Sequence, residues 1–423
     1  MFVHLDLGWM SHPFALSSFR IADAGQIATI RSLGLARVRW SPDKSDAEAG
    51  TMPAALPGNS AATASAPLAV EAQPAPALRP MPLARDTRRE ALAARRNAVV
   101  LCLRQYAEAA QGWRQSIDQV RDDPLGAGQR ISALSGALVN KMLSSREISI
   151  RALAETAADR ASHALNVCVV ALLLGKTCGL TETELQDLGV GALSHDVGKL
   201  ELPRRLHRVD PDFTRPEMAL YRDHVAHGTA HGKRMGLAPG ALLVIAQHHE
   251  HCDGSGFPQG LDINRLSVAA RLTALANRYD NLCHPAQAAR ALTPHEALSK
   301  LFTQGQGHYD PSLLTSFVRM MGVYPPGSVV QLTDDRFAVI DSVNSSRPLK
   351  PRVMVHDPKV SRVEPVWLDL ESEPALGIRR SLPAAQLPRA AQEALRPAVR
   401  MSWFFEGSVD GPDADPQVQA TRH

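Results

Sequence analysis

The stretch Ser194-His195-Asp196-Val197-Gly198-Lys199 decides how this chain is interpreted. A His-Asp pair alone is weak support for a metal site in a protein with 16 histidines. Four further histidines, however, lie in neighbouring segments that are predicted to be helical: His163, His224, His248 and His249. Imidazoles and carboxylates that converge from several helices typically form a two-metal site. Such a site can polarise a phosphate and generate hydroxide from water near neutral pH.

Length and composition indicate a protein of several folded domains. The chain has 423 residues, of which 44% are hydrophobic and 21% charged, so two or three domains are expected. The net charge of +3 is too small to indicate a nucleic-acid partner. The N-terminus lacks the pattern of a signal peptide, and the longest apolar run, Val167 to Leu174, is too short to span a bilayer. Five cysteines without a CxxC pair suit a reducing compartment, so we expect a cytoplasmic protein.

Hydrophobic periodicity and proline content divide the chain into segments of different character. We expect a small α/β module at 1–45, an Ala/Pro-rich linker at 46–84, a helical domain at 85–325, a small β-rich module at 326–385, and a helical then disordered tail at 386–423. The composition of the linker cannot bury a core. The predicted fold class is therefore mainly α, a multi-helix bundle flanked by two small modules.

Individual elements follow from capping residues and from runs of apolar residues. The first module should contain a helix at 24–32 and a strand at 35–40. Predicted helices of the helical domain cover 86–120, 127–144, 147–178, the segment from 181 to the His-Asp pair, 216–235, 241–249, 267–282, 293–302 and 311–321. Runs with β pattern follow at 329–332, 337–340 and 352–355, and a helix is expected around 390–400.

Single histidines also have a simpler interpretation. His163 stands at the polar end of a helix that is apolar nearly all round, where a backbone carbonyl could satisfy its side chain. His224, His227 and His231 fall at i, i+3 and i+7, and we expect one of them to bind a metal. Only the set as a whole indicates a metal centre.

The stretch from about 150 to 325 resembles the HD-GYP family of cyclic di-GMP phosphodiesterases. The matching residues are His163, His195-Asp196-Val197-Gly198-Lys199, His224, His248-His249-Glu250, Asp253-Gly254-Ser255-Gly256-Phe257-Pro258 and Gly307-His308-Tyr309-Asp310-Pro311. The N-terminal module resembles, more weakly, a small domain of unknown role that often precedes HD-GYP domains. The resemblance implies an HD-type metal-dependent phosphohydrolase bundle that linearises cyclic di-GMP to pGpG, or carries it on to GMP.

The resemblance implies a site for two divalent metal ions that share one carboxylate. The implied ligands are His163, His195 and Asp196 for one metal, and Asp196, His224, His248 and His249 for the other. A bridging hydroxide would attack the phosphodiester, with the metals stabilising the attacking and leaving oxygens. Mixed His and Asp ligands accept iron, manganese, zinc or nickel. Asp159, one helical turn before the first histidine, stands where some members hold a third metal.

Further roles carry over from the same resemblance. Lys199 would stabilise charge on the phosphate or protonate the leaving group, which makes it, with Asp196, a predicted catalytic residue. Gly254 and Gly256 would let a loop turn tightly near the substrate. The loop from Gly254 to Gly260 is also a proposed docking surface for a protein partner.

Three departures from the family pattern stand in the sequence. Phe257 replaces a tyrosine and loses one hydroxyl. Asn277 stands where the family has its last metal-binding carboxylate, and Asp280 is the second, non-ligand acid of that motif. Asparagine offers a neutral carbonyl oxygen but no charge to the metals. The basic residues that contact substrate phosphate in the family after this helix are missing from 284–289, and only Arg290 lies nearby, so we expect Arg290 to contact the substrate.

Three functions are therefore compared. The leading one is a metal-dependent phosphodiesterase acting on cyclic di-GMP. The second is a degenerate HD-GYP protein that binds nucleotide or protein as a regulator, which Asn277 favours. The third is an HD-type hydrolase of another phosphate ester. Metal content of the purified protein distinguishes the first from the second.

Overall fold

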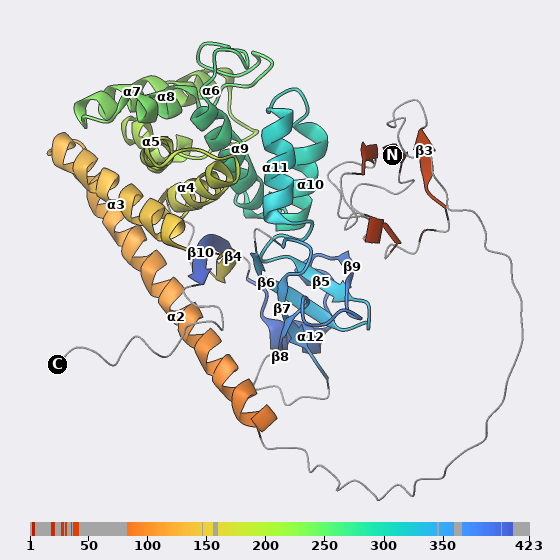
Figure 1. Ribbon diagram of the computed structural model, residues 1–423. Helices are drawn as coiled ribbons and strands as arrows, with labels where there is room; N and C mark the ends of the chain where they lie inside the picture. Colours follow the sequence, from red (N-terminus) through yellow and green to blue (C-terminus); the bar gives the residue numbers. More distant parts are fainter. Residues whose placement is uncertain are drawn as a thin grey trace, which may run out of the picture. The chain divides into compact units, whose positions relative to one another are not determined.

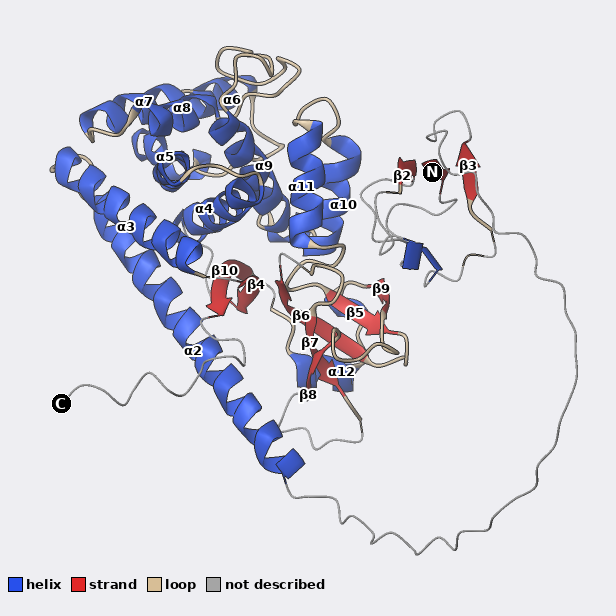
Figure 2. Cartoon of the chain, viewed as in Figure 1, coloured by secondary structure: helices blue, strands red, loops and turns tan. Residues whose placement is uncertain are grey.

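The computed structural model describes residues 2–4, 18–21, 27–28, 30–31, 35, 37–41, 83–145, 147–154, 160–344, 347–358, 366–398 and 400–408 (Figure 1). The chain forms two compact units, residues 1–99 and 100–423. Figure 2 shows helices gathered at one side of the second unit and strands at the other. None of the described helices is long and apolar enough to cross a membrane.

The first unit contains a three-stranded antiparallel sheet in the order β2-β1-β3. Its strands are β1 (Phe2–His4), β2 (Ser18–Arg20) and β3 (Arg39–Ser41). Val3 and Ile30 are buried together beneath it. Helical residues at 27–28 and 30–31 fall within the helix predicted at 24–32, whereas β3 begins later than the strand predicted at 35–40. The predicted linker lies outside the described residues up to residue 82.

Two long helices lead into the second unit. Helix α2 (Leu83–Asp118) largely coincides with the helix predicted at 86–120, and α3 (Pro124–Ser144) with that at 127–144. Within the second unit, the indole nitrogen of Trp113 on α2 donates to the Leu193 carbonyl at 2.8 Å. The Tyr106 hydroxyl lies 2.6 Å from the Ser402 hydroxyl. The last turns of α2 therefore contact both the helices and the sheet.

Helix α4 (Arg160–Thr177) forms the centre of the bundle and is buried on nearly every side. The helices around it are α5 (Glu182–Ser194), α6 (Arg215–Arg222), α7 (His224–Arg234), α8 (Pro239–Gln247), α9 (Val268–Cys283), α10 (Pro294–Gln304) and α11 (Pro311–Met321). Short 3-10 helices are η3 (Val197–Glu201), η4 (Arg204–Leu206) and η5 (Ala288–Arg290). The predicted helix at 216–235 is wrong at one point, because Asp223 ends α6 and begins α7.

A seven-stranded sheet packs beside the bundle, with the order β10-β4-β6-β5-β9 and with β7 and β8 continuing from β6. Its strands are β4 (Glu147–Ala154), β5 (Val329–Leu332), β6 (Phe337–Asn344), β7 (Arg352–His356), β8 (Val366–Asp369), β9 (Ile378–Ser381) and β10 (Met401–Ser408). One face is covered by the short helices η6 (Ala384–Gln386) and α12 (Arg389–Leu395), whose Ala391 and Leu395 pack on Val329. All pairings in this sheet are antiparallel.

The predicted helix at 147–178 is wrong in its first part, because residues 147–154 form strand β4. Ile148 and Ile150 alternate as a strand requires, but the arginine, alanines and leucine that follow are good helix formers. Pairing with β6 and along the whole of β10 outweighs that propensity. Helix α4 begins only at Arg160.

The predicted tail at 386–423 is also wrong in its middle part. Residues 401–408 form β10, whose Trp403, Phe404 and Phe405 are buried. The sheet is therefore not confined to 326–385, since it takes β4 from before the bundle and β10 from after it. Residues 409–423 lie outside the described part of the chain.

The two added strands are held by a buried ion-pair network around Arg151, whose side chain is 1% exposed. Its guanidinium contacts Asp341 of β6 at 2.6 Å and Glu406 of β10 at 2.8 Å. Burial opposes the charge on Arg151, but the two carboxylates outweigh this effect and raise its pKa. One residue of β4 thus connects both neighbouring strands.

We expect Arg151→Ala to destabilise the protein by about 3–5 kcal/mol, because it removes the buried charge that faces the mostly buried carboxylates of Asp341 and Glu406. Chemical unfolding with a far-ultraviolet circular dichroism readout measures this. The control is Arg379→Ala, which removes an exposed ion pair with Asp335 and should cost less than about 1 kcal/mol. Equally small losses of unfolding free energy in Arg151→Ala and Arg379→Ala would show that the ion pairs of Arg151 do not hold the seven-stranded sheet together.

Candidate metal centre

Three histidines of the second unit stand where a helix ends. His195 caps α5, His224 follows the last turn of α6, and His248 caps α8. The Nδ1 atom of each faces the carbonyl three residues earlier, at 2.7 Å for His195, 2.5 Å for His224 and 2.8 Å for His248. The last turn of a helix leaves such carbonyls without an intrahelical donor. Each imidazole therefore satisfies a helix end with Nδ1 and directs Nε2 elsewhere.

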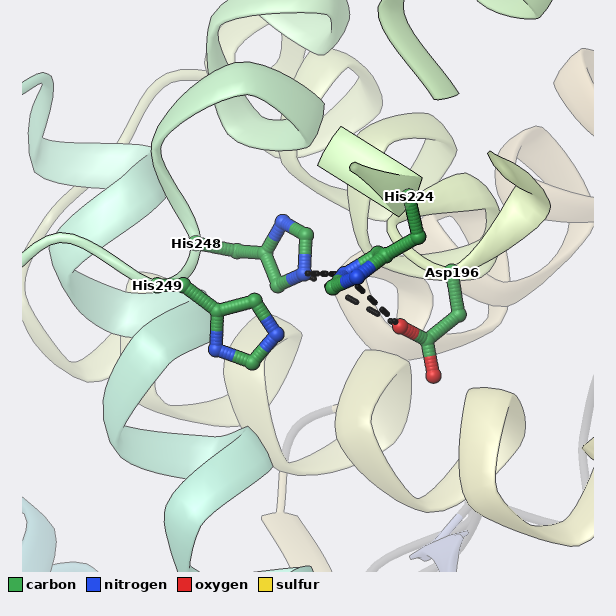
Figure 3. A group of neighbouring side chains, drawn as sticks. All are labelled: Asp196, His224, His248 and His249. Carbon is green, nitrogen blue, oxygen red and sulfur yellow. Dashed lines mark hydrogen bonds and ion pairs between the residues drawn. The ribbon is translucent and has the colours of Figure 1, made fainter. Parts of the chain in front are cut away.

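The Nε2 atoms converge on the carboxylate of Asp196. On one side, Nε2 of His163 and of His195 each lie 3.5 Å from Oδ2. On the other side, Nε2 of His224 lies 3.6 Å and that of His248 3.9 Å from Oδ1. We call His163, His195 and Asp196 the first group. The second group comprises Asp196, His224, His248 and His249, which Figure 3 shows side by side.

The protonation states of the imidazoles fit a bound cation. Because a carbonyl only accepts hydrogen bonds, Nδ1 of His224 and His248 must carry the proton. Burial lowers the pKa of His224 to about 4 and that of His248 well below its usual value, so both rings are neutral near pH 7. Their Nε2 atoms, 3.3 Å apart, then face each other with lone pairs and no proton to share. A metal ion between such atoms removes the repulsion.

Further observations agree with a metal at each group. Burial likewise lowers the pKa of His195 to about 4, and its Nε2 lies 3.2 Å from Nε2 of His163. Oδ1 of Asp196 is buried and has no hydrogen-bond partner. Burial alone would raise the pKa of Asp196, but Lys199 and the imidazoles outweigh it and hold that pKa well below its usual value. The donor set of imidazole and carboxylate suits divalent transition metals.

His163 is oriented by Asp280 of α9, the acid that the sequence motif places outside the metal ligands. Nδ1 of His163 lies 2.6 Å from Oδ2 of Asp280. Oδ1 of Asp280 accepts from Asn166 at 2.8 Å and faces Nδ1 of His284 at 2.9 Å. Burial would raise the pKa of Asp280, but His284 and His163 outweigh it and lower it. Carboxylates behind ligating histidines commonly fix the ring in this way.

Lys199 lies on the first turn after the His-Asp pair, within η3. Its Nζ donates to Oδ2 of Asp196 at 2.6 Å and lies 5.2 Å from the centre of the Tyr221 ring. Burial would lower the pKa of Lys199, but Asp196 and Tyr221 outweigh it and raise it. A buried cation is therefore held beside the shared carboxylate.

Gly198 lets the two groups approach each other. A Cβ at this position would overlap the carbonyl of His224 and the backbone nitrogen of Gly228. The missing side chain of Gly198 therefore allows η3 to lie directly against α7. This contact brings Asp196 within reach of the histidines of the second group.

Two cavities meet the metal centre. One contains His163, Asp196 and Lys199, together with Arg160 and Arg208. The other, a groove, is lined by His248 and His249 and is bordered by Arg222, Arg278, Lys300 and Phe257. Asn281 lines both. The surroundings of the centre thus carry positive charge from several elements.

The loop after the two adjacent histidines is anchored by Glu250, which is 2% exposed. Its carboxylate accepts from the backbone nitrogens of Gln259 and Leu261 at 2.7 and 2.9 Å. Gly254 has a φ of +78°, and Gly256 lies so close to the backbone of Glu250 that a Cβ would overlap it. The Phe257 ring stacks on His249 at 4.5 Å, a contact that needs no tyrosine hydroxyl. Docking of a protein partner to this loop stays a prediction.

Other predicted site residues have mixed outcomes. Asn277 lines the groove with His248, and its Oδ1 accepts from Asn281 at 2.6 Å, so its role as a metal ligand stays a prediction. Arg290 is exposed at the end of η5 and lines neither cavity, and its contact to substrate stays a prediction. Asp159 lies outside the described residues.

Sequence reasoning missed a third cluster of possible ligands, His251, Asp253 and His308. The rings of His251 and His308 stack at 4.6 Å, and Nε2 of His308 lies 3.6 Å from Asp253. It also missed the groove residues Arg222 and Arg278, which no motif marks. Their position depends on how α6 and α9 pack, and spacing along the chain does not show it.

Comparison with known proteins agrees with this site. The HD domain family matches residues 137–313, and a domain of unknown function, DUF3391, matches residues 1–130. The cyclic di-GMP phosphodiesterase PA4108 of Pseudomonas aeruginosa is 28% identical over 364 residues, 84% of this chain and 82% of that protein. The cyclic di-GMP phosphodiesterase response regulator RpfG of Xanthomonas campestris is 26% identical over 208 residues, 49% of this chain and 55% of that protein.

Among solved structures, the HDG"Y"P protein Bd1817 from Bdellovibrio bacteriovorus has 19% sequence identity and a TM-score of 0.41, over 51% of this chain and 70% of that chain. The chain thus spans most of the first relative but only about half of the second. These sequence matches identify the class as the HD-domain proteins. Within that class the chain is similar to cyclic di-GMP phosphodiesterases, in agreement with its resemblance to the HD-GYP family, and residues 1–130 match the DUF3391 domain.

We expect Asp196→Ala to lose metal from both groups and to abolish phosphodiesterase activity, because the two oxygens of this side chain face different groups. Metal analysis by mass spectrometry and initial rates measure this. Asp196→Asn keeps the shape and serves to separate lost charge from lost packing around Lys199. Asp223→Asn, which changes an exposed acid beside His224, is the control. Turnover and metal content that survive Asp196→Ala would contradict a shared carboxylate.

We expect Asn277→Asp to tighten metal binding about 10-fold or more, because it adds a negative charge beside neutral imidazoles. The new carboxylate can still accept from Asn281, so the fold should hold. Titration against a chelator measures the affinity. Asn264→Asp, an exposed change of the same kind, should leave it unaltered. An unchanged affinity in Asn277→Asp would place residue 277 outside the metal shell.

Proposed function

We propose that this protein hydrolyses cyclic di-GMP to pGpG with two divalent metal ions, one at each group. The observation that carries the proposal is the shared carboxylate, since Asp196 has two imidazole Nε2 atoms within 3.5 Å of Oδ2 and two within 3.9 Å of Oδ1. The substrate is supported by relatives named as cyclic di-GMP phosphodiesterases, one of which is matched over 82% of its length. Metal ions bound there would supply Lewis acidity and a nucleophile from water near neutral pH.

The side chains around the centre perform the remaining tasks. Asp196 fixes the position of the two groups relative to each other, and Asp280 holds the ring of His163. Lys199 keeps its proton, because Asp196 raises its pKa. This favours stabilisation of negative charge on the phosphate over donation of a proton to the leaving oxygen.

The cavities supply the binding of an anionic substrate. A cyclic dinucleotide carries two phosphates, and only one can be cleaved at the metal centre at a time. Arg222, Arg278 and Lys300 border the groove, so they are placed to attract the other phosphate and the substrate as a whole. These residues come from α6, α9 and α10, and they could take the part that the missing basic residues at 284–289 play in the family.

The proposal is tested with metal-free protein that is reloaded with iron, manganese, zinc or nickel in turn. Cyclic di-GMP should be converted to pGpG with at least one of these metals. Chromatography of the reaction products measures this conversion and any further cleavage to GMP. Protein that binds two metal ions but does not cleave cyclic di-GMP would contradict the activity. Binding of cyclic di-GMP without turnover would favour a regulator, the alternative that Asn277 raises.

We expect Lys199→Ala to lower kcat by about 10²–10³ while metal content stays unchanged, because one charged donor beside the reacting phosphate is lost. Lys199→Arg retains the charge and should recover part of the rate. Lys233→Ala, an exposed lysine at the end of α7, is the control. Loss of metal or of the fold in Lys199→Ala would make this lysine structural.

A further inference from the structure

Strand β10 lies directly behind the first group, although it is far beyond residue 313, where the HD domain match ends. Trp403 of this strand is fully buried. Its ring centre lies 5.1 Å from that of Tyr279 and 5.4 Å from that of His284, on α9 and just after it. Its backbone nitrogen donates to Oδ1 of Asn166 on α4 at 3.1 Å. β10 therefore contacts both helices that hold His163 in place.

The hydrogen bond from Trp403 sets the direction of the Asn166 amide. A backbone nitrogen only donates, so the oxygen of this amide must face β10 and its nitrogen must point the opposite way. That nitrogen donates to Oδ1 of Asp280 at 2.8 Å. A reversed amide would place two donors together at β10 and two oxygens together at Asp280. β10 thereby ensures that Oδ1 of Asp280 faces the amide nitrogen of Asn166 and not the amide oxygen.

Asp280 passes this constraint on to the metal ligand. Its Oδ1 is occupied by Asn166 and by His284, whose ring also touches Trp403. Its Oδ2 is left to Nδ1 of His163, at 2.6 Å. With Nδ1 held in this way, Nε2 of His163 faces Asp196. The connection from the strand to the ligand runs through buried or nearly buried side chains only.

Strand β10 is itself firmly attached. It pairs with β4 over eight residues, from Met401 opposite Ala154 to Ser408 opposite Glu147. Glu406 adds the ion pair to Arg151. The strand that closes the sheet is thus held by β4, the element that comes just before α4 in the chain.

We propose that β10 is a positioning element of the metal centre, acting through Asn166 and Asp280 on His163. The proposal rests on the two-metal centre proposed above. It assigns the second unit's sheet a role in metal binding that the HD domain alone does not supply, and it makes Asn166 and Trp403 positioning residues. It predicts that damage to this connection weakens the first group and spares the second one.

The test uses the full chain and counts Mn²⁺ equivalents by equilibrium dialysis over a range of free metal concentration. Asn166→Leu replaces the amide by an apolar side chain of similar volume, so it removes the hydrogen bonds to Trp403 and to Asp280. Asn166→Ser keeps a polar group but is one atom shorter than asparagine, so it should lose the hydrogen bond to Asp280. Both variants should bind one equivalent of Mn²⁺ with the affinity of the parent protein. They should bind the other equivalent about 10–100-fold more weakly. His163→Ala provides the reference for a lost first group.

One control separates positioning from general stability. Val353→Ala truncates a core cluster of β5, β6 and β7 that does not include Trp403, so it should lower the melting temperature and leave metal binding unchanged. Circular dichroism of every variant records whether the fold is kept.

Parent affinity at both sites in Asn166→Leu and Asn166→Ser would overturn the proposal. Equal weakening of both sites in Asn166→Ser would also overturn it, because that result indicates a general structural role. A parent protein that binds two equivalents but does not cleave cyclic di-GMP would refute the proposed activity and leave this connection intact.

Discussion

The structure depends on one electrostatic constraint, the convergence of imidazole nitrogens that have no proton to share. The Nε2 atoms of His224 and His248 approach to 3.3 Å, and their Nδ1 protons are committed to the carbonyls of Tyr221 and Ile245. Such an arrangement is unfavourable unless a cation lies among the nitrogens. The ends of α5, α6 and α8, the close contact at Gly198 and the buried α4 all bring these atoms together.

The balance of charges at the metal centre explains why it suits an anionic substrate. Neutral imidazoles bring no charge, and Asp196 is the only carboxylate in the two groups. With two divalent ions and the ammonium of Lys199 beside that carboxylate, the centre would carry a large positive charge. A bound phosphodiester offsets part of it. If Asn277 holds a metal as the resemblance implies, it would leave this excess larger than a carboxylate at the same position would.

Local sequence predicted those parts of the fold and site that depend on neighbouring residues. The start of α5 at its N-cap residue, Thr181, the bounds of α11 and the histidines around the His-Asp pair were all predicted. What failed depends on partners far away in the chain. Strand β4 contains a buried arginine whose two carboxylates are 190 and 255 residues distant, and no local pattern reveals them. The role of Asp280 is hidden for the same reason, because its partner His163 is 117 residues away.

Pairing of β4 with β10 has a consequence for how the protein is made. About 250 residues separate the two strands, so at typical synthesis rates β10 emerges roughly 10–50 s after β4. During that time the edge of β4 that faces β10 lacks its partner, and Glu406 has not yet reached Arg151. An unpaired edge of this kind invites contact with other chains. The nascent protein therefore needs protection until residues 401–408 arrive, and complete metal binding should begin only after that point.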